Sequence, residues 1–189
     1  MPIIINGGSR SAGWWWAGHL QSAKNEKVEI IEIVGLSADN IPDAFREMYA
    51  LARGSKCTNY FYEYDINPRA DEHLTDKQWD EAHEMTRQNL GHADQPYFRV
   101  RHTKPDGRIH EHGISFRVDL EQMKAIPDSL TARIHEQTSR ELEQKFGLEP
   151  GRSILVADRD FERPARRAKK WERFRGAQNG IDGSEGPSA

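Results

Sequence analysis

The sequence predicts an α+β fold, a two-layer or sandwich arrangement in which helices flank a central and largely antiparallel β-sheet. Four segments carry the 3.6-residue apolar period of amphipathic helices, and four others alternate or run apolar as strands do. These segments do not follow the strand-helix-strand rhythm of a parallel sheet. At 189 residues the chain is long enough for one domain with a hydrophobic core.

The predicted helices share an apolar face and a boundary signal at one end or both, and they cover residues 11–23, 41–53, 76–90 and 128–146. Ser9 and Ser11 are expected caps for the first helix, and Thr75 for the third. Leu130 begins the expected apolar face of the fourth helix.

The predicted strands cover residues 28–34, 59–66, 97–102 and 109–118. Alternation with a period of two is clearest in the second and fourth of them. The last two flank a turn-forming sequence, so we expect them to pair as a hairpin.

The charge distribution divides the chain. Residues 163–175 contain seven Lys or Arg against one Glu, a net charge of +6, and residues 176–189 carry −2. Because the whole chain carries −3, residues 1–162 carry −7. We expect a domain at 1–150, a basic and partly helical extension at 151–176 with a helix from Pro164, and a disordered linker at 177–189.

Composition also bears on location. The single cysteine, Cys57, excludes an internal disulfide framework and suits a reducing cytoplasm. The chain shows no apolar run of membrane-spanning length and no basic-then-apolar leader. We expect a cytoplasmic protein without a membrane segment.

The most informative segment runs from Tyr97 to Asp119. Its centre, Lys104-Pro105-Asp106-Gly107, matches a type I turn with proline second and glycine fourth, which closes a three-residue hairpin loop with a bulge. The resulting register pairs His102 with His110 and puts His112 on the same face. A two-residue loop would instead pair His102 with Ile109.

Three histidines in this register converge on one point, close enough to share a divalent cation. Three imidazoles leave coordination positions open, as a catalytic site requires. The alternative is a surface hairpin that is rich in histidine without function. Glu111 points to the opposite face and is not an expected ligand.

The histidine segment resembles the metal motif of plasmid mobilisation relaxases, in the HUH endonuclease superfamily. The similarity lies in His102, in His110-Glu111-His112 and in the sequence after them, and it extends over residues 1–150 through the helices before and after the motif. It implies an antiparallel sheet with the metal site facing a DNA groove and an enzyme that nicks one strand at an origin of transfer. It also implies Mg²⁺ or Mn²⁺, although imidazole ligands suit Zn²⁺ equally.

The family pattern has a catalytic tyrosine on an N-terminal helix, where this sequence has His19. Either His19 is the nucleophile, giving a phosphohistidine link to the 5′ end, or catalysis has been lost. His19 is otherwise a helix residue packed beside tryptophans. The other tyrosines considered are strand residues: Tyr60, Tyr62, Tyr64 and Tyr97.

A histidine nucleophile needs a carboxylate to set its tautomer. Glu63 and Asp65 lie on one face of their predicted strand and are the expected catalytic acids, with Asp65 slightly favoured. The alternative is that both simply face solvent.

Single-stranded or hairpin origin DNA is the implied partner, together with accessory origin-binding proteins and a coupling protein. The residues expected to contact DNA are aromatic or basic: Trp14, Trp15, Trp16, Arg10, Arg99, Arg101, Arg108, Arg117, Arg166, Arg167, Lys169 and Lys170. At least one of the three tryptophans should be exposed, while core packing is the default for two of them.

Two rival functions remain open. One is a module of the same fold that binds origin DNA without cutting it. The other is a small-molecule enzyme with a three-histidine metal site, for which a closed apolar pocket over the metal would be the sign.

Overall fold

A computed structural model describes residues 3–22, 27–69 and 71–149. The basic extension and the tail predicted for residues 151–189 lie outside these ranges, so those predictions stay predictions. None of the described helices is long and apolar enough to cross a bilayer.

Four helices and seven strands make up the described chain. The helices are α1 (Gly13–Leu20), α2 (Ile41–Ala52), α3 (Asp76–Asn89) and α4 (Thr131–Phe146). The strands are β1 (Ile4–Arg10), β2 (Lys27–Val34), β3 (Phe61–Asn67), β4 (Tyr97–Thr103), β5 (Ile109–Phe116), β6 (Val118–Asp119) and β7 (Lys124–Ala125).

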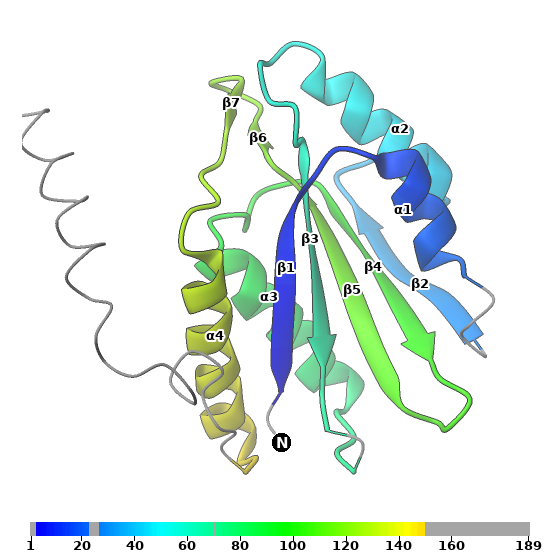
Figure 1. Cartoon of the computed structure of the whole chain (residues 1–189), viewed down its shortest axis with the longest axis vertical. Coiled ribbons are helices and arrows are strands. Elements are labelled where there is room, and N and C mark those ends of the chain that lie inside the picture. The colour runs from blue at the N-terminus through cyan, green and yellow to red at the C-terminus, as the bar shows by residue number, and fades with distance from the viewer. Residues whose placement is uncertain (1–2, 23–26, 70, 150–189) are drawn as a thin grey trace, which may run out of the picture. The chain divides into compact units, whose positions relative to one another are not determined.

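Five strands form one sheet in the order β1-β3-β5-β4-β2, and β6 and β7 form a separate two-stranded ribbon. Every pairing between neighbours in the larger sheet is antiparallel. Figure 1 shows α1 and α2 together over one face and α3 and α4 over the other. The predicted α+β sandwich with a central antiparallel sheet is therefore confirmed, with helices on both faces.

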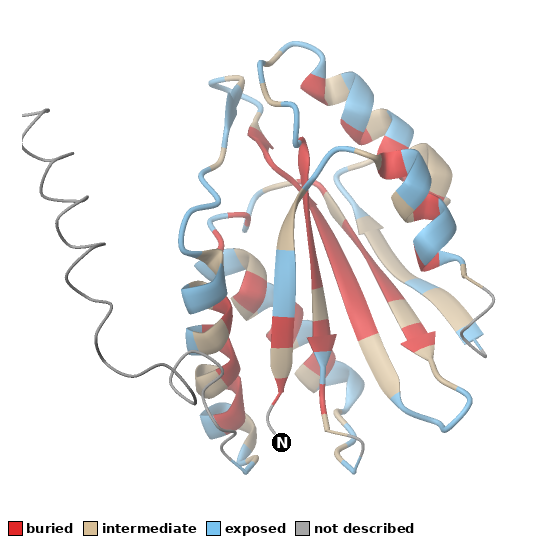
Figure 2. Ribbon diagram, in the orientation of Figure 1, coloured by how far each residue is buried: buried red, intermediate tan, exposed pale blue. Residues whose placement is uncertain are grey.

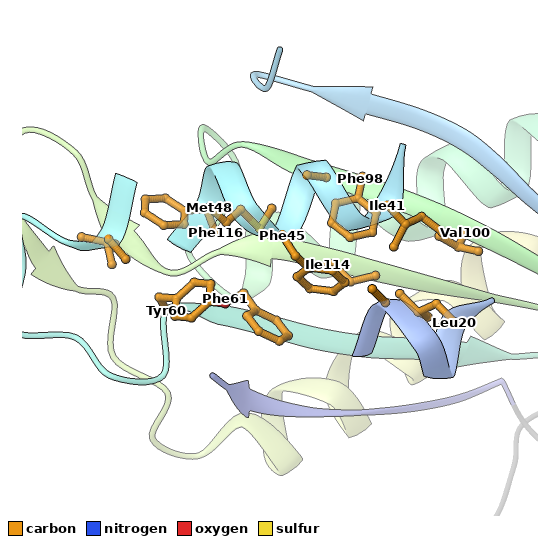
Figure 3. Close-up of a cluster of buried hydrophobic side chains, with 14 residues drawn as sticks. Leu20, Ile41, Phe45, Met48, Tyr60, Phe61, Phe98, Val100, Ile114 and Phe116 are labelled. Atoms are coloured by element: carbon orange, nitrogen blue, oxygen red, sulfur yellow. The ribbon is translucent and has the colours of Figure 1, made fainter. Parts of the chain in front are cut away.

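Each face of the sheet has its own hydrophobic core. Under α1 and α2, Phe45 and Leu20 pack on Phe61, Phe98 and Ile114 of the sheet (Figure 3). On the other face, Trp79 of α3 and Leu142 of α4 belong to a second cluster. Figure 2 shows the buried residues concentrated in the central strands, which helices cover on both faces.

The edge strand β1 was not predicted. Its sequence, IINGGSR, lacks the β-branched and aromatic residues that mark strands after its first two positions. The glycines disfavour a strand by intrinsic propensity, but they allow β1 to pair with β3. A Cβ on Gly7 would lie 2.6 Å from the Glu63 carbonyl oxygen and 2.9 Å from the Tyr62 ring. Only glycine lets β1 approach β3 this closely.

Two predicted helix starts are wrong. α1 begins at Gly13 with Ala12 as N-cap and no side-chain cap, because Ser9 is engaged within β1. α4 begins at Thr131, and Leu130 is an exposed residue with φ of 64° rather than part of the apolar face. Thr75 is confirmed as the N-cap of α3, and the structure adds a capping box, since Gln78 and Thr75 cap each other's backbone N–H groups.

Candidate active site

The β4–β5 hairpin has the predicted turn and register. Gly107 has φ of 82° and donates its N–H to the Lys104 carbonyl at 2.8 Å, and Lys104 donates its N–H to the Arg108 carbonyl at 2.8 Å. The Cα register pairs His102 with His110 and Val100 with His112. All three histidines therefore lie on the face that α1 and α2 cover.

The three imidazoles surround one point. Each ring offers a nitrogen, and these atoms lie within 4.8 Å of one another. The ring centroids of His102, His110 and His112 are 4.7 to 5.1 Å apart. Nitrogen ligands about 2.0–2.2 Å from a shared ion are at most about 4.4 Å apart, so nitrogens within 4.8 Å of one another are close to the spacing of a metal site.

The Leu20 carbonyl sets the tautomer of His102. It lies 2.7 Å from His102 Nε2 and can only accept, so Nε2 carries the proton. His102 Nδ1, with its free lone pair, then faces His110 Nε2 at 3.3 Å. The C-terminal turn of α1 thereby fixes which nitrogen of the strand residue can bind a metal.

Glu63 sets the tautomer of His112 in the same way. Its Oε1 lies 3.1 Å from His112 Nδ1, and both side chains are buried. The proton on Nδ1 leaves the Nε2 lone pair for a cation, as in the carboxylate–histidine pairs that support metal ligands. Glu63 was predicted to orient His19, and its hydrogen bond goes to His112 instead.

The ligand histidines are neutral at ordinary pH. Burial, with neighbouring positive groups second, lowers the pKa of His102 and of His112 to about 4 and that of His110 to about 3. Neutral imidazole is the form that coordinates metals. These residues therefore fit one divalent cation, which His102 Nδ1, His110 Nε2 and His112 Nε2 could bind.

His19 lies beside this cluster at the end of α1. Its ring stacks on Trp15, with centroids 5.1 Å apart and planes 8° apart, and meets Trp16 edge-on at 5.2 Å. The His112 ring is 6.4 Å away, centroid to centroid. Two tryptophans thus hold an exposed histidine against the predicted metal centre.

A pocket of about 370 Å³ joins these groups. It is lined by all three ligand histidines and His19, by Asp65, and by four further polar residues: Ser22, Asn67, Lys104 and Arg108. Burial and the neighbouring Glu63 raise the pKa of Asp65 to about 6, and burial raises that of Glu63 to about 7. The pocket is open and polar, which disfavours the small-molecule enzyme, whose expected sign was a closed apolar pocket.

Ser22, Asn67 and Lys104 were missed in the sequence. Lys104 belongs to the turn that the sequence identified, so its position beside the histidines could have been predicted. Ser22 and Asn67 reach the pocket only because α1 and β3 end beside the hairpin, and no local pattern signals this.

The predicted DNA-contacting arginines divide into two groups. Arg108 lines the pocket, and Arg10 lies 5.5 Å from the Trp16 ring, so both are near the site. Arg99, Arg101 and Arg117 were also predicted to contact DNA, and their positions in the structure contradict this. Arg117 is buried and donates to the carbonyls of Asn59 and Ile126.

Arg99 and Arg101 lie on the opposite face of the sheet from the histidines. Arg99 is only 4% exposed and forms ion pairs of 2.7 Å with Glu32 and Asp80. Arg101 Nε is 2.7 Å from Glu111 Oε1. A strand alternates faces, and the histidines occupy the other one, so these arginines cannot reach a phosphate at the metal site.

Glu111 points away from the histidines, as predicted, and is fully buried. Its Oε2 lies 3.0 Å from His83 Nε2, and the Tyr64 hydroxyl lies 3.0 Å from His83 Nδ1. Burial alone would raise the pKa of Glu111, but bonds from His83 and Arg101 hold it below its usual value. This network holds β5 at Glu111, between His110 and His112, from the opposite face of the sheet.

The remaining buried histidines, His83, His92 and His135, each contact an aromatic or charged side chain. His83 belongs to the Glu111 network, His135 Nε2 lies 2.8 Å from the Tyr62 hydroxyl, and the His92 ring meets Tyr62 edge-on. Burial lowers the pKa of His92 and of His135 to about 4. They are structural residues of the second core.

The tryptophans differ from the default expectation. Trp14 is 81% and Trp15 50% exposed, so only Trp16 packs against the core. The expectation that at least one indole would be exposed is confirmed. Arg166, Arg167, Lys169 and Lys170, the other predicted DNA contacts, lie outside the described residues.

The fold and the site together define an α+β sandwich with an open three-histidine pocket on its central hairpin. A family model described as "Relaxase: MobA/VirD2-like, nuclease domain" matches residues 19–148. The chain belongs to this relaxase family, whose nuclease domain nicks DNA. No curated protein matched the chain.

Proposed function

We propose that this chain nicks one DNA strand at an origin of transfer and rejoins it, with His19 as the nucleophile. The observation that carries the proposal is that His19 and the three histidines line one pocket. His19 is exposed there and held by Trp15 and Trp16, so its ring is oriented before DNA arrives.

His102, His110 and His112 hold the cation, for which Mn²⁺ or Mg²⁺ is expected and Zn²⁺ is the alternative. When bound, the cation polarises the scissile phosphate as a Lewis acid. The hydrogen bonds from Leu20 and Glu63 keep two of the ligand rings in the tautomer that binding requires.

The chemical step belongs to His19. A lone pair of its neutral imidazole forms a bond to phosphorus, and the bond from phosphorus to the 3′ oxygen breaks. The ring gives up its remaining N–H proton, and the 3′ oxygen takes up one proton, so protons balance. The 5′ phosphate is left attached to His19 as a phosphoramidate, which is energy-rich enough for the 3′ hydroxyl to reverse the step.

Asp65 is the carboxyl group placed to handle those protons. It lines the pocket with His19, and its pKa of about 6 lets it accept and return a proton near neutral pH. Glu63 acts through His112 and is a positioning residue.

The proposed partner is the single strand exposed at a hairpin origin, with accessory origin-binding proteins, a coupling protein and a bacterial cytoplasmic setting implied by the family. Arg10 and Arg108 are the described arginines near the pocket, and Trp14 and Trp15 offer exposed rings for unpaired bases.

The test is capture of a covalent protein–DNA adduct. The full chain is mixed with Mn²⁺ and a randomised single-stranded library, denatured, and the attached DNA is sequenced while the attached peptide is identified by mass spectrometry. We expect an adduct on His19 that is lost with EDTA and in His19→Ala, and that acid cleaves because phosphoramidates are acid-labile.

The matched control is His73→Ala, since His73 is an exposed histidine outside the pocket. Its adduct should equal that of the unchanged protein. An acid-stable adduct on a tyrosine would move the nucleophile elsewhere. Sequence-specific binding with no adduct under any divalent cation would favour the rival function of an origin-binding module.

A further inference from the structure

A second hollow lies on the other side of α1 from the metal pocket. It is a groove of about 500 Å³ between α1 and α2, with Phe45 and Tyr60 among the residues beneath it. Trp14 and Tyr49 line it and are 81% and 58% exposed, and Arg46 is the cationic group among its lining residues. Nothing in the nicking chemistry uses this groove.

Gly18 lines the groove, and no packing contact with the described residues requires a glycine there. It stands inside an α-helix, where glycine lowers stability relative to alanine. A Cβ added at Gly18 would meet no atom of the described residues within 4 Å. Gly13 in the same helix is different, because a Cβ there would lie 2.9 Å from Phe45 Cβ and from the Tyr60 hydroxyl.

An unneeded helix glycine at a groove lined with aromatic rings is typical of a place where a ligand approaches the backbone closely. The volume is within the range of small-molecule sites. Exposed aromatic rings with a nearby guanidinium are the combination that holds unpaired bases by stacking and by cation–π contact.

The groove and the metal pocket share α1 as a wall. Gly18 and Gln21 line the groove, while His19 and Ser22 line the metal pocket. A strand whose phosphate lies against His19 therefore meets the groove on the far side of one helix. This continuity favours DNA over a peptide as the occupant.

We propose that the α1–α2 groove binds one unpaired nucleobase of the strand being cut, next to the scissile phosphate. The base stacks with Trp14 and Tyr49, Arg46 faces the adjoining phosphate, and Gly18 leaves room for the nucleotide against the helix backbone. This inference rests on the proposed function, because it takes the DNA strand to lie at His19.

Photocross-linking tests the inference directly. The probe is a single-stranded oligonucleotide with 5-iodouracil in place of thymine, irradiated with the full chain and mapped by mass spectrometry. We expect cross-links to Trp14, Tyr49 or Tyr60, reduced at least several-fold in Gly18→Leu, which fills the groove. Cross-links confined to other residues overturn the groove as a base site, whether or not an adduct forms at His19.

The two proposals fail separately. Cross-links in the groove without a His19 adduct would retain the base site and remove the nucleophile. A His19 adduct with cross-links only elsewhere would do the reverse. Absence of both would overturn both.

A binding cycle gives the second measurement. In the His19→Ala background, oligonucleotides of the sequence found by adduct capture, or oligothymidylate if none is found, carry a single abasic site at successive positions. One position should lose about 5- to 100-fold in affinity, the range expected for one stacked base. Trp14→Ala should cause a similar loss on the intact strand and no further loss on that abasic strand.

Gly18→Ala separates binding from stability. It should raise the melting temperature, because alanine is the better helix residue, and still weaken DNA binding. Leu120→Ala is the control for exposed apolar surface, since Leu120 is 45% exposed and outside the groove, and it should leave affinity unchanged. Unchanged affinity in both Gly18→Ala and Trp14→Ala would refute the inference.

Discussion

Single hydrogen bonds decide how the ligand histidines present their nitrogens. His102 is set by a backbone carbonyl at the end of α1, which side-chain substitution cannot remove. His112 is set by a side chain, Glu63, which substitution can change. The two residues therefore differ in how they can be tested.

Glu63→Ala should weaken Mn²⁺ binding by about 10- to 100-fold, the usual effect of removing the group that orients a ligand histidine. Glu63→Gln should weaken it less, because the amide oxygen still accepts from His112 Nδ1. Isothermal titration with Mn²⁺ measures both. Glu121→Gln, at an exposed turn residue, is the control, and equal affinities for all four proteins would contradict the assigned role.

Glu111 is the residue whose loss should most harm the fold. Glu111→Ala would leave Arg101 and His83 without their buried carboxylate partner, and breaking a buried ion pair costs about 3–5 kcal/mol. The free energy of unfolding in urea measures this. Asp106→Ala removes an exposed ion pair to Arg108, which solvent screens, so its loss of unfolding free energy should be much smaller. Similar losses in the two variants would contradict the argument.

At the scale of elements, the β4–β5 hairpin assembles the metal site by its register alone. The bulged turn puts His102 opposite His110, and the strand period of two puts His112 on the same face as His110. α1 then adds two things from outside the sheet, the Leu20 carbonyl and His19. The site thus forms where this hairpin, the end of α1 and the neighbouring strand β3 meet.

Deleting Thr103 should keep the turn between Lys104 and Arg108 and pair His102 with Ile109 in place of His110. His102 would then face α3, and Mn²⁺ affinity should fall by at least tenfold, the effect of losing a group that supports the metal. The Asp106→Ala variant keeps the number of residues between the turn and His102 and should bind Mn²⁺ normally. Tight binding by the deletion variant would show that the register does not depend on the turn.

At the scale of the whole molecule, buried neutral histidines make stability depend on pH. His92 and His135 have a pKa of about 4 when folded and about 6.5 when unfolded. Between these values the unfolded chain binds more protons, so stability is full above about pH 6.5 and is lost as the pH falls towards 4.

Each of these histidines should cost about 1 kcal/mol of unfolding free energy at about pH 5.5. Urea unfolding at pH 7.5 and 5.5, with EDTA present to exclude metal, measures the loss. His135→Gln can still bond to the Tyr62 hydroxyl but does not titrate, so its loss should be smaller by that amount. A pH dependence unchanged by this substitution would exclude His135 as a source.

Much of the fold and the metal triad could be predicted because their determinants are local. Thr75 and Gln78 cap α3 within one turn, and Pro105, Asp106 and Gly107 fix a bend whose register follows from geometry. By contrast, no local sequence pattern indicates which DNA bases the proposed groove beside α1 would bind. Strand β1 was not predicted because its glycines are required by the close approach of β3, which is distant in the sequence.

The sequence by itself determined the sandwich, the hairpin register and the three ligand histidines, since periodicity and turn chemistry act between residues close along the chain. Only the tertiary structure decided that Glu63 bonds to His112, that Arg99 and Arg101 are buried behind the sheet, and that His19 meets the metal pocket. Those outcomes depend on which side chains distant segments bring together. That choice is made by packing in three dimensions, between partners that lie 19 to 93 residues apart in the sequence.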